Sequence, residues 1–447
     1  MTAPDRTTTA TRPQHATGNR QTRHREPALI DRVLAGIDVH ASKFVAAVLK
    51  PDHSLDILEC GSARRRDLEA FVAELVVHEV ECVAIEATGV YWLRLHTLLA
   101  EQGIEVILAN PQQVRAVAGR KTDSRDARRL VYALANNSLE PSVIACAEQR
   151  ELRALTRGRV GFVRSKTAHK NRIHKILRGA GIPLKDAVRD LFSNGMLALL
   201  QALAQGQEPD FEQPAIKKLR QKTRDKLREV LDGGFRLNAS ERLVLRLELQ
   251  ALAACEQAIK ELDDAITAWL EQHPIWNAAV TIVDSIAGIG LTSAATIVAE
   301  CGWDMSRFAT EGHLASWAGV CPGQCESAGR KGSGKVPKGN PYVKRVLAEC
   351  AQSLAASQKP GTPGYSLHQW VRRKAGRMHW NKAVFALAHR LLRLVWILLS
   401  RVEEYSEQIH AGMLAREEQR RIERAARYLR DQGYTVEQPT APIPLLP

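Results

Sequence analysis

The pattern of apolar residues changes near residue 148, and this change constrains the fold more than any other feature of the sequence. Between residues 31 and 147, short β-branched and apolar runs alternate with segments of helical period. This alternation predicts an α/β domain with a partly parallel sheet. After residue 148 the strand patterns vanish, and long amphipathic helical stretches follow. We therefore expect an α/β N-terminal domain, a long helical middle and an all-α C-terminal part.

Composition and pattern divide the 447 residues into six expected segments. They are a disordered basic arm (1–30), the α/β domain (31–147), a helical, coiled-coil-like linker (148–274) with an insertion at 183–239, a compact helical domain (275–360), basic C-terminal helices (361–431) and a Pro-rich tail (432–447). The two long helices of the linker could pair within the chain or across subunits. Residues 383–399 are the most apolar stretch, but His389, Arg390 and Arg393 interrupt it. A core or interface helix is therefore expected there, and no membrane partner.

The charge of the chain points to a polyanionic partner. Lysine and arginine number 63 and aspartate and glutamate 49, which gives a formal net charge of +14. Such a surplus favours nucleic acid as the partner, with an unrelated basic enzyme as the alternative. The polar, basic start is not typical of a signal peptide, and the eight cysteines are spread thinly. We therefore expect a protein of the reducing cytoplasm with free thiols.

A very basic helix is expected between Arg150 and Arg178. Its density of charge predicts a surface that follows a nucleic-acid backbone, and a solvated helix face is the alternative. The candidate binding residues on this helix are Arg157, Arg164, Lys170, Arg172 and Lys175.

Four acidic residues stand in three separate elements of the α/β domain. Asp38 lies inside an apolar strand, where a carboxylate is costly unless it is paired or binds a cation, and Glu86 ends a second short strand. Asp123 and Asp126 lie three positions apart at the start of a helix, so they share one face. Together they predict a site for Mg²⁺, with Mn²⁺ as a further possibility. In the alternative, Asp123 caps its helix and the acids pair with the plentiful arginines.

Two features of the helical domain are candidate contacts with DNA or RNA. Gly288 and Gly290 lie in a tight turn between two expected helices, like the turn of a helix-hairpin-helix element, whose amides can bind a phosphate. A simple tight turn is the alternative. A Gly-rich cationic loop follows, which could hold a phosphate beside its serines or be merely a solvated loop. The cations of this loop that could hold a phosphate are Arg330, Lys331, Lys335 and Lys338.

The sequence resembles a known family in both halves of the chain. The stretches "GIDVHASKF", "IEATGVYW" and "NPQQVRAVAGRKTDSRDARRLVYAL" resemble the RuvC-like (RNase H-like) domain of the DEDD transposases of the IS-one-ten family of insertion sequences. Asp38, Glu86, Asp123 and Asp126 match the four acidic letters of that pattern in order. The region from "SIAGIGLTSAATIVAECG" to "NPYVKRVLAECA" is similar to the family's serine-bearing transposase domain. The resemblance covers roughly two-thirds of the chain, and the larger size indicates the IS-eleven-eleven subgroup.

The resemblance implies an RNA-guided DNA recombinase. A structured non-coding RNA, the bridge or seek RNA, would read donor and target DNA by base pairing. Ser327 would attack DNA and form a covalent intermediate, together with the metal-bearing carboxylates of another subunit in a tetramer built from dimers. The family shows Ser followed directly by Gly, whereas this chain has Ser327-Ala328-Gly329, so Ser333 is a second candidate. A RuvC-like metal-dependent nuclease or resolvase that uses water, and a non-catalytic nucleic-acid scaffold, are the alternatives.

Overall fold

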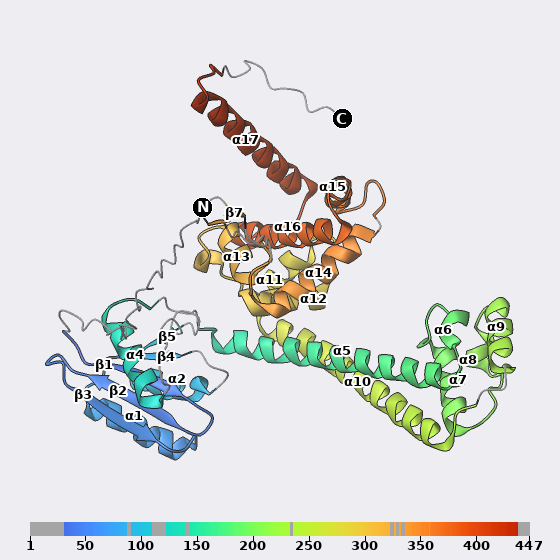
Figure 1. Ribbon diagram of the computed structural model, residues 1–447, viewed down its shortest axis with the longest axis horizontal. Helices are drawn as coiled ribbons and strands as arrows, with labels where there is room; N and C mark the ends of the chain where they lie inside the picture. The colour runs from blue at the N-terminus through green and yellow to red at the C-terminus, as the bar shows by residue number, and fades with distance from the viewer. Residues whose placement is uncertain are drawn as a thin grey trace, which may run out of the picture. The chain divides into compact units, whose positions relative to one another are not determined.

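The computed structural model describes residues 31–86, 91–109, 122–139, 144–232, 236–321, 336–356 and 358–436, and the backbone of residues 326–327 and 330–331. Two compact units make up the chain, Met1–Ile144 and Ala145–Pro447, and Figure 1 shows the elements of both. The finer division of the chain into domains stays a prediction.

The first unit contains a five-stranded sheet. Its strands are β1 (Leu34–Val39), β2 (Phe44–Leu49), β3 (Leu55–Cys60), β4 (Cys82–Glu86) and β5 (Glu105–Ala109). The strand order is β3-β2-β1-β4-β5; β2 is antiparallel to both β3 and β1, whereas β4 runs parallel to both β1 and β5. The prediction of an α/β fold with a partly parallel sheet is confirmed for this unit.

Helices cover both faces of this sheet. One face packs on α1 (Arg65–Val77) and α2 (Trp92–Glu101), and the other packs on α4 (Asp123–Ala135). Successive residues of a strand point to opposite faces. In β1, Ala35, Ile37 and Val39 belong to the core beneath α1 and α2, and the intervening residues face α4. The short helix or turn predicted at residues 111–119 lies outside the described residues.

Two long helices open the second unit and pack against each other within the chain. They are α5 (Ala147–Gly179) and α10 (Ala239–Gln272) (Figure 1). Ion pairs join them, including Arg159–Asp263 at 2.5 Å and Lys166–Glu256 at 2.9 Å. The prediction that these helices form is confirmed, and their pairing is intramolecular in this chain. Coiled-coil geometry stays a prediction.

Shorter helices lie between the two long ones in the sequence. They are α6 (Leu184–Ala187), α7 (Asn194–Gln205), α8 (Pro214–Lys217) and α9 (Gln221–Asp232). They build their own apolar core against the adjoining ends of α5 and α10, with Ile173, Met196 and Leu245 among its fully buried side chains. This part of the chain therefore folds around a core separate from that of the C-terminal helices.

A larger helical core follows. It is formed by α11 (Pro274–Asp284), α12 (Leu291–Cys301), the 3-10 helix η1 (Met305–Arg307), α13 (Glu311–Ala318), α14 (Pro341–Ala356), α15 (Tyr365–Ala375) and α16 (Trp380–Arg401). Helix α16 is long and apolar enough to cross a membrane by composition, but 67% of its most apolar window is buried inside the unit. Leu387, Leu391 and Leu394 are fully buried in the core. The apolar character of helix α16 is thus explained by its place in the core of this unit.

The final helix, α17 (Glu407–Asp431), is fixed at its N-terminal end by a buried polar network. His410 is fully buried; its Nδ1 lies 2.6 Å from the Ser366 hydroxyl and its Nε2 lies 3.0 Å from the Arg390 guanidinium. Burial lowers the pKa of His410 to about 4, and the Arg390 charge acts in the same direction. The guanidinium can only donate, so Nε2 accepts and the protonated Nδ1 donates to Ser366.

Candidate functional site

The predicted acidic residues lie on one face of the sheet. Leu34 and Ala127 belong to the core beneath α4, so the alternation along β1 places Asp38 on the α4 face as well. Cys82 and Ala84 belong to the same core, so Glu86 at the end of β4 also faces α4. Because β1 and β4 are parallel and pair up to Ile37 and Ile85, Asp38 and Glu86 stand at the same edge of the sheet.

Helix α4 approaches this edge closely because β1 carries a glycine opposite it. A Cβ atom at Gly36 would lie 2.4 Å from the carbonyl oxygen of Ala127 and 2.4 Å from the amide nitrogen of Val131. No side chain fits at such distances. Gly36 therefore lets the start of α4, which carries Asp123 and Asp126, lie next to Asp38.

A tight cluster of possible metal ligands results. One ligand atom each from Asp38, His40 and Asp123 lies within 4.8 Å of the others. His40 Nε2 is 3.1 Å from Asp38 Oδ2 and 3.5 Å from Asp123 Oδ1. Lys43 completes the surroundings, with its Nζ 3.4 Å from Asp123 Oδ2. Asp38 is only 7% exposed, whereas His40 is exposed and Asp123 is half-buried.

Burial and neighbouring charge both act on Asp38. Burial raises the pKa of the Asp38 carboxyl above its usual range; His40 opposes this shift, and the charges of Asp126 and Asp123 add to it. Asp126 also accepts a hydrogen bond from Arg129 at 3.2 Å. A buried carboxylate beside two further carboxylates is an arrangement that a cation would stabilise.

The donor atoms present fit a divalent cation. Two carboxylates and an imidazole suit Mn²⁺, and carboxylates with water suit Mg²⁺. Asp38, His40 and Asp123 could be ligands, and Glu86 and Asp126 lie on the same face for further contacts. The arrangement could hold a cation at the open edge of the sheet, where a phosphodiester could reach it.

Three details of this cluster differ from the prediction or extend it. Thr122, not Asp123, is the N-cap of α4, and no side-chain cap bond is formed there, so the capping alternative for Asp123 is wrong. The alternative that arginines pair with these acids applies to Asp126 through Arg129, while Asp38 pairs with His40. His40 itself was not predicted, although its position two residues after Asp38, where the strand ends, was a usable signal.

In the second unit, the two glycines of the predicted turn have different surroundings. Gly288 has a positive φ of 85°, and a Cβ there would lie 2.9 Å from Leu354 Cβ, so packing against α14 requires a glycine. Gly290 is the N-cap of α12, and nothing lies within 4 Å of its Cβ position. The two helices and the turn between them are thus present, and Gly290 is the glycine of this turn that has free space around it. Phosphate binding there stays a prediction.

The segment that carries the candidate serine is only partly described. Ser327 pairs with Arg330 in a two-stranded antiparallel ribbon formed by β6 (Glu326–Ser327) and β7 (Arg330–Lys331). Their side chains, together with Ser333 and Lys335, lie outside the described residues, whereas Lys338 is described and exposed. The choice of nucleophile stays a prediction.

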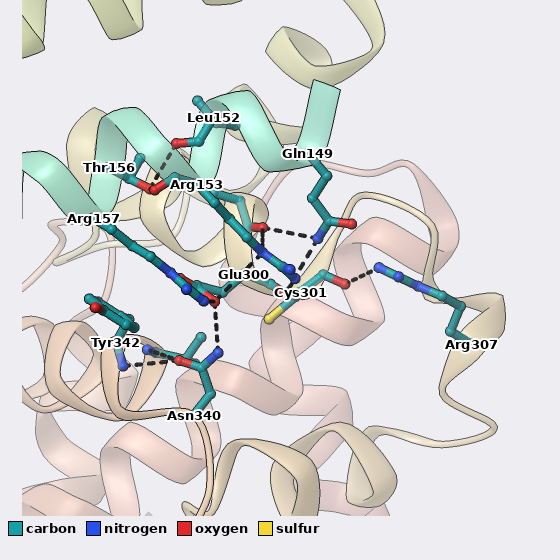
Figure 2. A network of polar contacts seen from close by, with 12 residues as sticks. Gln149, Leu152, Arg153, Thr156, Arg157, Glu300, Cys301, Arg307, Asn340 and Tyr342 are labelled. Carbon is teal, nitrogen blue, oxygen red and sulfur yellow. Dashed lines mark hydrogen bonds and ion pairs between the residues drawn. The ribbon is translucent and has the colours of Figure 1, made fainter. Parts of the chain in front are cut away.

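The cations of α5 divide into two groups. Arg157 Nε and Nη2 donate to the carboxylate of Glu300 at 2.6 and 2.8 Å (Figure 2), and Arg172 Nε lies 2.9 Å from Glu248 Oε1. Lys170 lies over the ring of Phe192 at 4.5 Å. By contrast, Lys175 is exposed and makes no ion pair with the described part of the chain. Part of the positive charge of this helix is therefore used inside the protein.

Arg164 has no ion pair with the described residues either, but it lies near an aromatic ring. Its guanidinium stands 5.8 Å from the centre of the Tyr342 ring, and the residue is exposed. Arg164 and Lys175 thus remain the candidates of α5 that are most open to a polyanion.

Comparison with known proteins agrees with these features. Two protein-family models match the chain: the DEDD transposase model of the IS110 (IS-one-ten) family, described as "Transposase", over residues 35–182, and "Transposase IS116/IS110/IS902 family" over residues 280–366. The first match spans all four predicted acids, and the second spans the turn at Gly288 and the segment of Ser327.

Curated relatives extend the similarity over most of the chain. A probable family 20 transposase of Pseudomonas aeruginosa is 28% identical over 78% of this chain and 93% of the relative. The transposase for insertion sequence element IS1111A of Coxiella burnetii is 25% identical over 85% of this chain and 93% of the relative. The transposase for IS1328 of Yersinia enterocolitica is 24% identical over 73% of this chain and 85% of the relative.

The two family models together cover about half of the chain; the first runs from the first unit through α5 of the second, and the other lies within the second unit. The three relatives are named as transposases, two of them of insertion sequence elements. The acid-bearing sheet edge and the helical serine-bearing region fall inside the matched segments. The chain belongs to the IS110 family of insertion-sequence transposases.

Proposed function

We propose that this transposase exchanges DNA strands by transesterification through a covalent serine–DNA intermediate, guided by a structured non-coding RNA. The single observation that carries the metal-dependent part of the proposal is the cluster of Asp38, His40 and Asp123 at one edge of the sheet. Membership of the family supports the remainder. The second unit would supply Ser327, and the first unit would supply the carboxylates.

The sheet of the first unit supports a RuvC-like assignment. The four acidic letters of the DEDD pattern correspond to one acid on the central strand β1, one at the end of its parallel neighbour β4, and two at the start of a helix on the same face. In this proposal Asp38, Glu86, Asp123 and Asp126 hold Mg²⁺, or Mn²⁺. When bound, such a cation lowers the pKa of an attacking hydroxyl and stabilises the charge of the phosphoryl group in flight.

The protein's own residues have three tasks in this reaction. The Ser327 hydroxyl gives up its proton as its oxygen forms a bond to phosphorus, one bridging P–O bond of the donor strand breaks, and the departing sugar oxygen takes up a proton, so that no net proton is consumed. The reverse reaction with another DNA end releases the serine, so no hydrolysis or external energy source is needed. Lys338 and the neighbouring cations hold the phosphate, and the exposed cations of α5, such as Lys175, follow the nucleic-acid backbone.

The proposal also includes the assembly. Donor and target DNA and the guide RNA are the partners, the protein acts as a tetramer of two dimers, and Ser327 works with the carboxylates of another subunit. It acts in the bacterial cytoplasm, on the nucleoid. The domain division is the one expected from the sequence, with a RuvC-like domain at 31–147 and a serine-bearing domain at 275–360.

A denaturing gel tests the chemistry. Purified protein is incubated with RNA transcribed from the flanks of its own element, Mg²⁺ and end-labelled donor DNA. The unsubstituted protein is compared with Ser327→Ala, Ser333→Ala and Asp38→Asn. We expect a protein–DNA band that is lost in Ser327→Ala and Asp38→Asn and kept in Ser333→Ala. Metal-dependent cleavage without a covalent band in any variant would instead establish a nuclease that uses water.

A further inference from the structure

A buried carboxylate joins three parts of the second unit that are far apart in the sequence. Glu300, near the C-terminal end of α12, is 1% exposed, and its carboxylate lies between α5 and the residues just before α14 (Figure 2). Arg157 of α5 donates two hydrogen bonds to it. From the other side, Asn340 Nδ2 donates to Glu300 Oε2 at 2.7 Å.

The charge of this carboxylate is balanced within the unit. The hydrogen bond to Glu300 raises the pKa of Arg157. Arg153 is also close, with its Nε 3.7 Å from Glu300 Oε2, but it hydrogen-bonds chiefly to the carbonyl oxygens of Ala299 and Glu300 at 2.8 and 2.7 Å. A buried carboxylate costs several kcal/mol of desolvation unless its partners are well placed, so the site is sensitive to any change in them.

Asn340 is the point at which this network reaches the serine-bearing segment. Its Oδ1 accepts hydrogen bonds from the amides of Tyr342 and Val343 at 2.9 and 3.1 Å, so it caps α14 while its amide group holds Glu300. One side chain therefore fixes both the start of α14 and the end of the chain segment that follows Ser327.

The same stretch is held tightly by its backbone. A Cβ at Gly339 would lie 2.4 Å from backbone atoms of Ala318 and Gly319, so the chain passes directly against the end of α13. Lys344 Nζ donates to the carbonyl oxygen of Pro337 at 2.9 Å. Residues 336–340 thus form a fixed stem, and Lys338 stands on it, exposed, between these anchors.

We infer that Glu300 is a positioning residue for strand exchange: through Asn340 it fixes the stem of the serine-bearing segment relative to the basic helix α5. This inference rests on the proposed function, because it assigns the stem a role in presenting Ser327. Glu300 acts through Asn340 and Arg157 and does not touch DNA. One carboxylate then fixes the position of the nucleophile, which the stem holds, relative to a nucleic acid bound along α5.

Glu300→Gln and Asn340→Ser test this in the full-length protein with its RNA, Mg²⁺ and labelled donor DNA. Glu300→Gln keeps the shape and removes the charge. Asn340→Ser keeps a capping oxygen for α14 but lacks the amide that reaches Glu300. Asp263→Asn is the matched control, because it breaks the Arg159 ion pair that joins α5 to α10 and leaves the stem alone.

The initial rate of covalent-band formation should fall roughly 10- to 100-fold in Glu300→Gln and Asn340→Ser, as expected for a nucleophile displaced by about 1 Å. The Kd for nucleic acid should stay unchanged. The control should stay within about twofold, since partly exposed ion pairs contribute little. The double variant Glu300→Gln/Asn340→Ser should be no slower than the slower single variant, because both substitutions break one link.

Hydrogen exchange separates this inference from the proposed function. The amides of Tyr342 and Val343, which donate to Asn340 Oδ1, should exchange faster in Glu300→Gln and Asn340→Ser than in Asp263→Asn. If the unsubstituted protein forms no covalent band, the proposed function fails, while exchange still reports on the stem. If the band forms at the same rate in folded Glu300→Gln or Asn340→Ser, or if their effects multiply in the double variant, Glu300 has no positioning role. Should Glu300→Gln fail to fold, Asn340→Ser alone decides.

Discussion

Replacing Gly36 by alanine tests how the sheet and α4 bring the acids together. The added Cβ would lie 2.4 Å from Ala127 O, 2.4 Å from Val131 N and 2.8 Å from Leu130 Cβ. Two of these three atoms belong to the helix backbone, so no side-chain rotation relieves the clash. Unstrained contacts begin near 3.5 Å, so α4 must retreat by about 1 Å.

The expected cost has two parts. Overpacking of this kind destabilises by about 1–3 kcal/mol, which should lower the melting temperature of the first unit. The same movement carries Asp123 and Asp126 away from Asp38, and a misplacement of about 1 Å at a reacting site can cost roughly 100-fold in rate. We therefore expect metal-dependent DNA cleavage to fall about 100-fold while nucleic-acid binding through α5 is kept.

Gly61→Ala provides the matched control, since nothing lies within 4 Å of a Cβ built at Gly61. Cleavage of labelled donor DNA in Mg²⁺ and hydrogen exchange of the β1 and α4 peptides would be measured on both variants. Cleavage and exchange in Gly36→Ala equal to those of Gly61→Ala would refute the argument that this glycine sets the distance between α4 and the acid on β1.

Three further predictions follow from the charges. The pKa of Asp38 is raised in the folded state, so its carboxylate costs stability above that pKa. Asp38→Asn should therefore raise the melting temperature at pH 7 in EDTA, and Mn²⁺ should stabilise the unsubstituted protein but not this variant. A lower melting temperature of Asp38→Asn in EDTA would contradict this. His410 has a folded-state pKa of about 4 against its usual 6.5, so between these pH values the unfolded chain binds more protons than the folded one. The free energy of unfolding should therefore fall as the pH drops from 6.5 to 4. Urea unfolding measured across this pH range should show the slope, and His410→Gln should reduce it. Lys175→Gln should lower the salt dependence of nucleic-acid affinity by about one counterion. Arg172→Gln should change the salt dependence less, because Glu248 already offsets the charge of Arg172. Equal changes for the two variants in filter binding would contradict the distinction between the paired and the unpaired cation.

The sequence by itself indicated the strands and helices of the described part of the first unit and the acidic residues of the site. Alternation of apolar runs with helical periods was sufficient for the strands and helices of the first unit, because strand and helix patterns differ in period. The carboxylate inside an apolar strand at Asp38 also marked the site, since a buried acid requires a partner wherever the strand lies.

Tertiary structure decided which of these residues meet. No local pattern says that Gly36 admits α4, that His40 turns toward Asp38, or that Asn340 reaches Glu300, forty residues away. Glu300 is a charged residue in an otherwise apolar helix, which signals a buried ion pair but does not name the partner. Likewise, the sequence does not distinguish among the cations of α5, and only packing reveals that Arg157 pairs with the buried carboxylate of Glu300. Local propensity follows from each residue and its near neighbours, whereas partners from distant segments are set by how the helices and sheet pack.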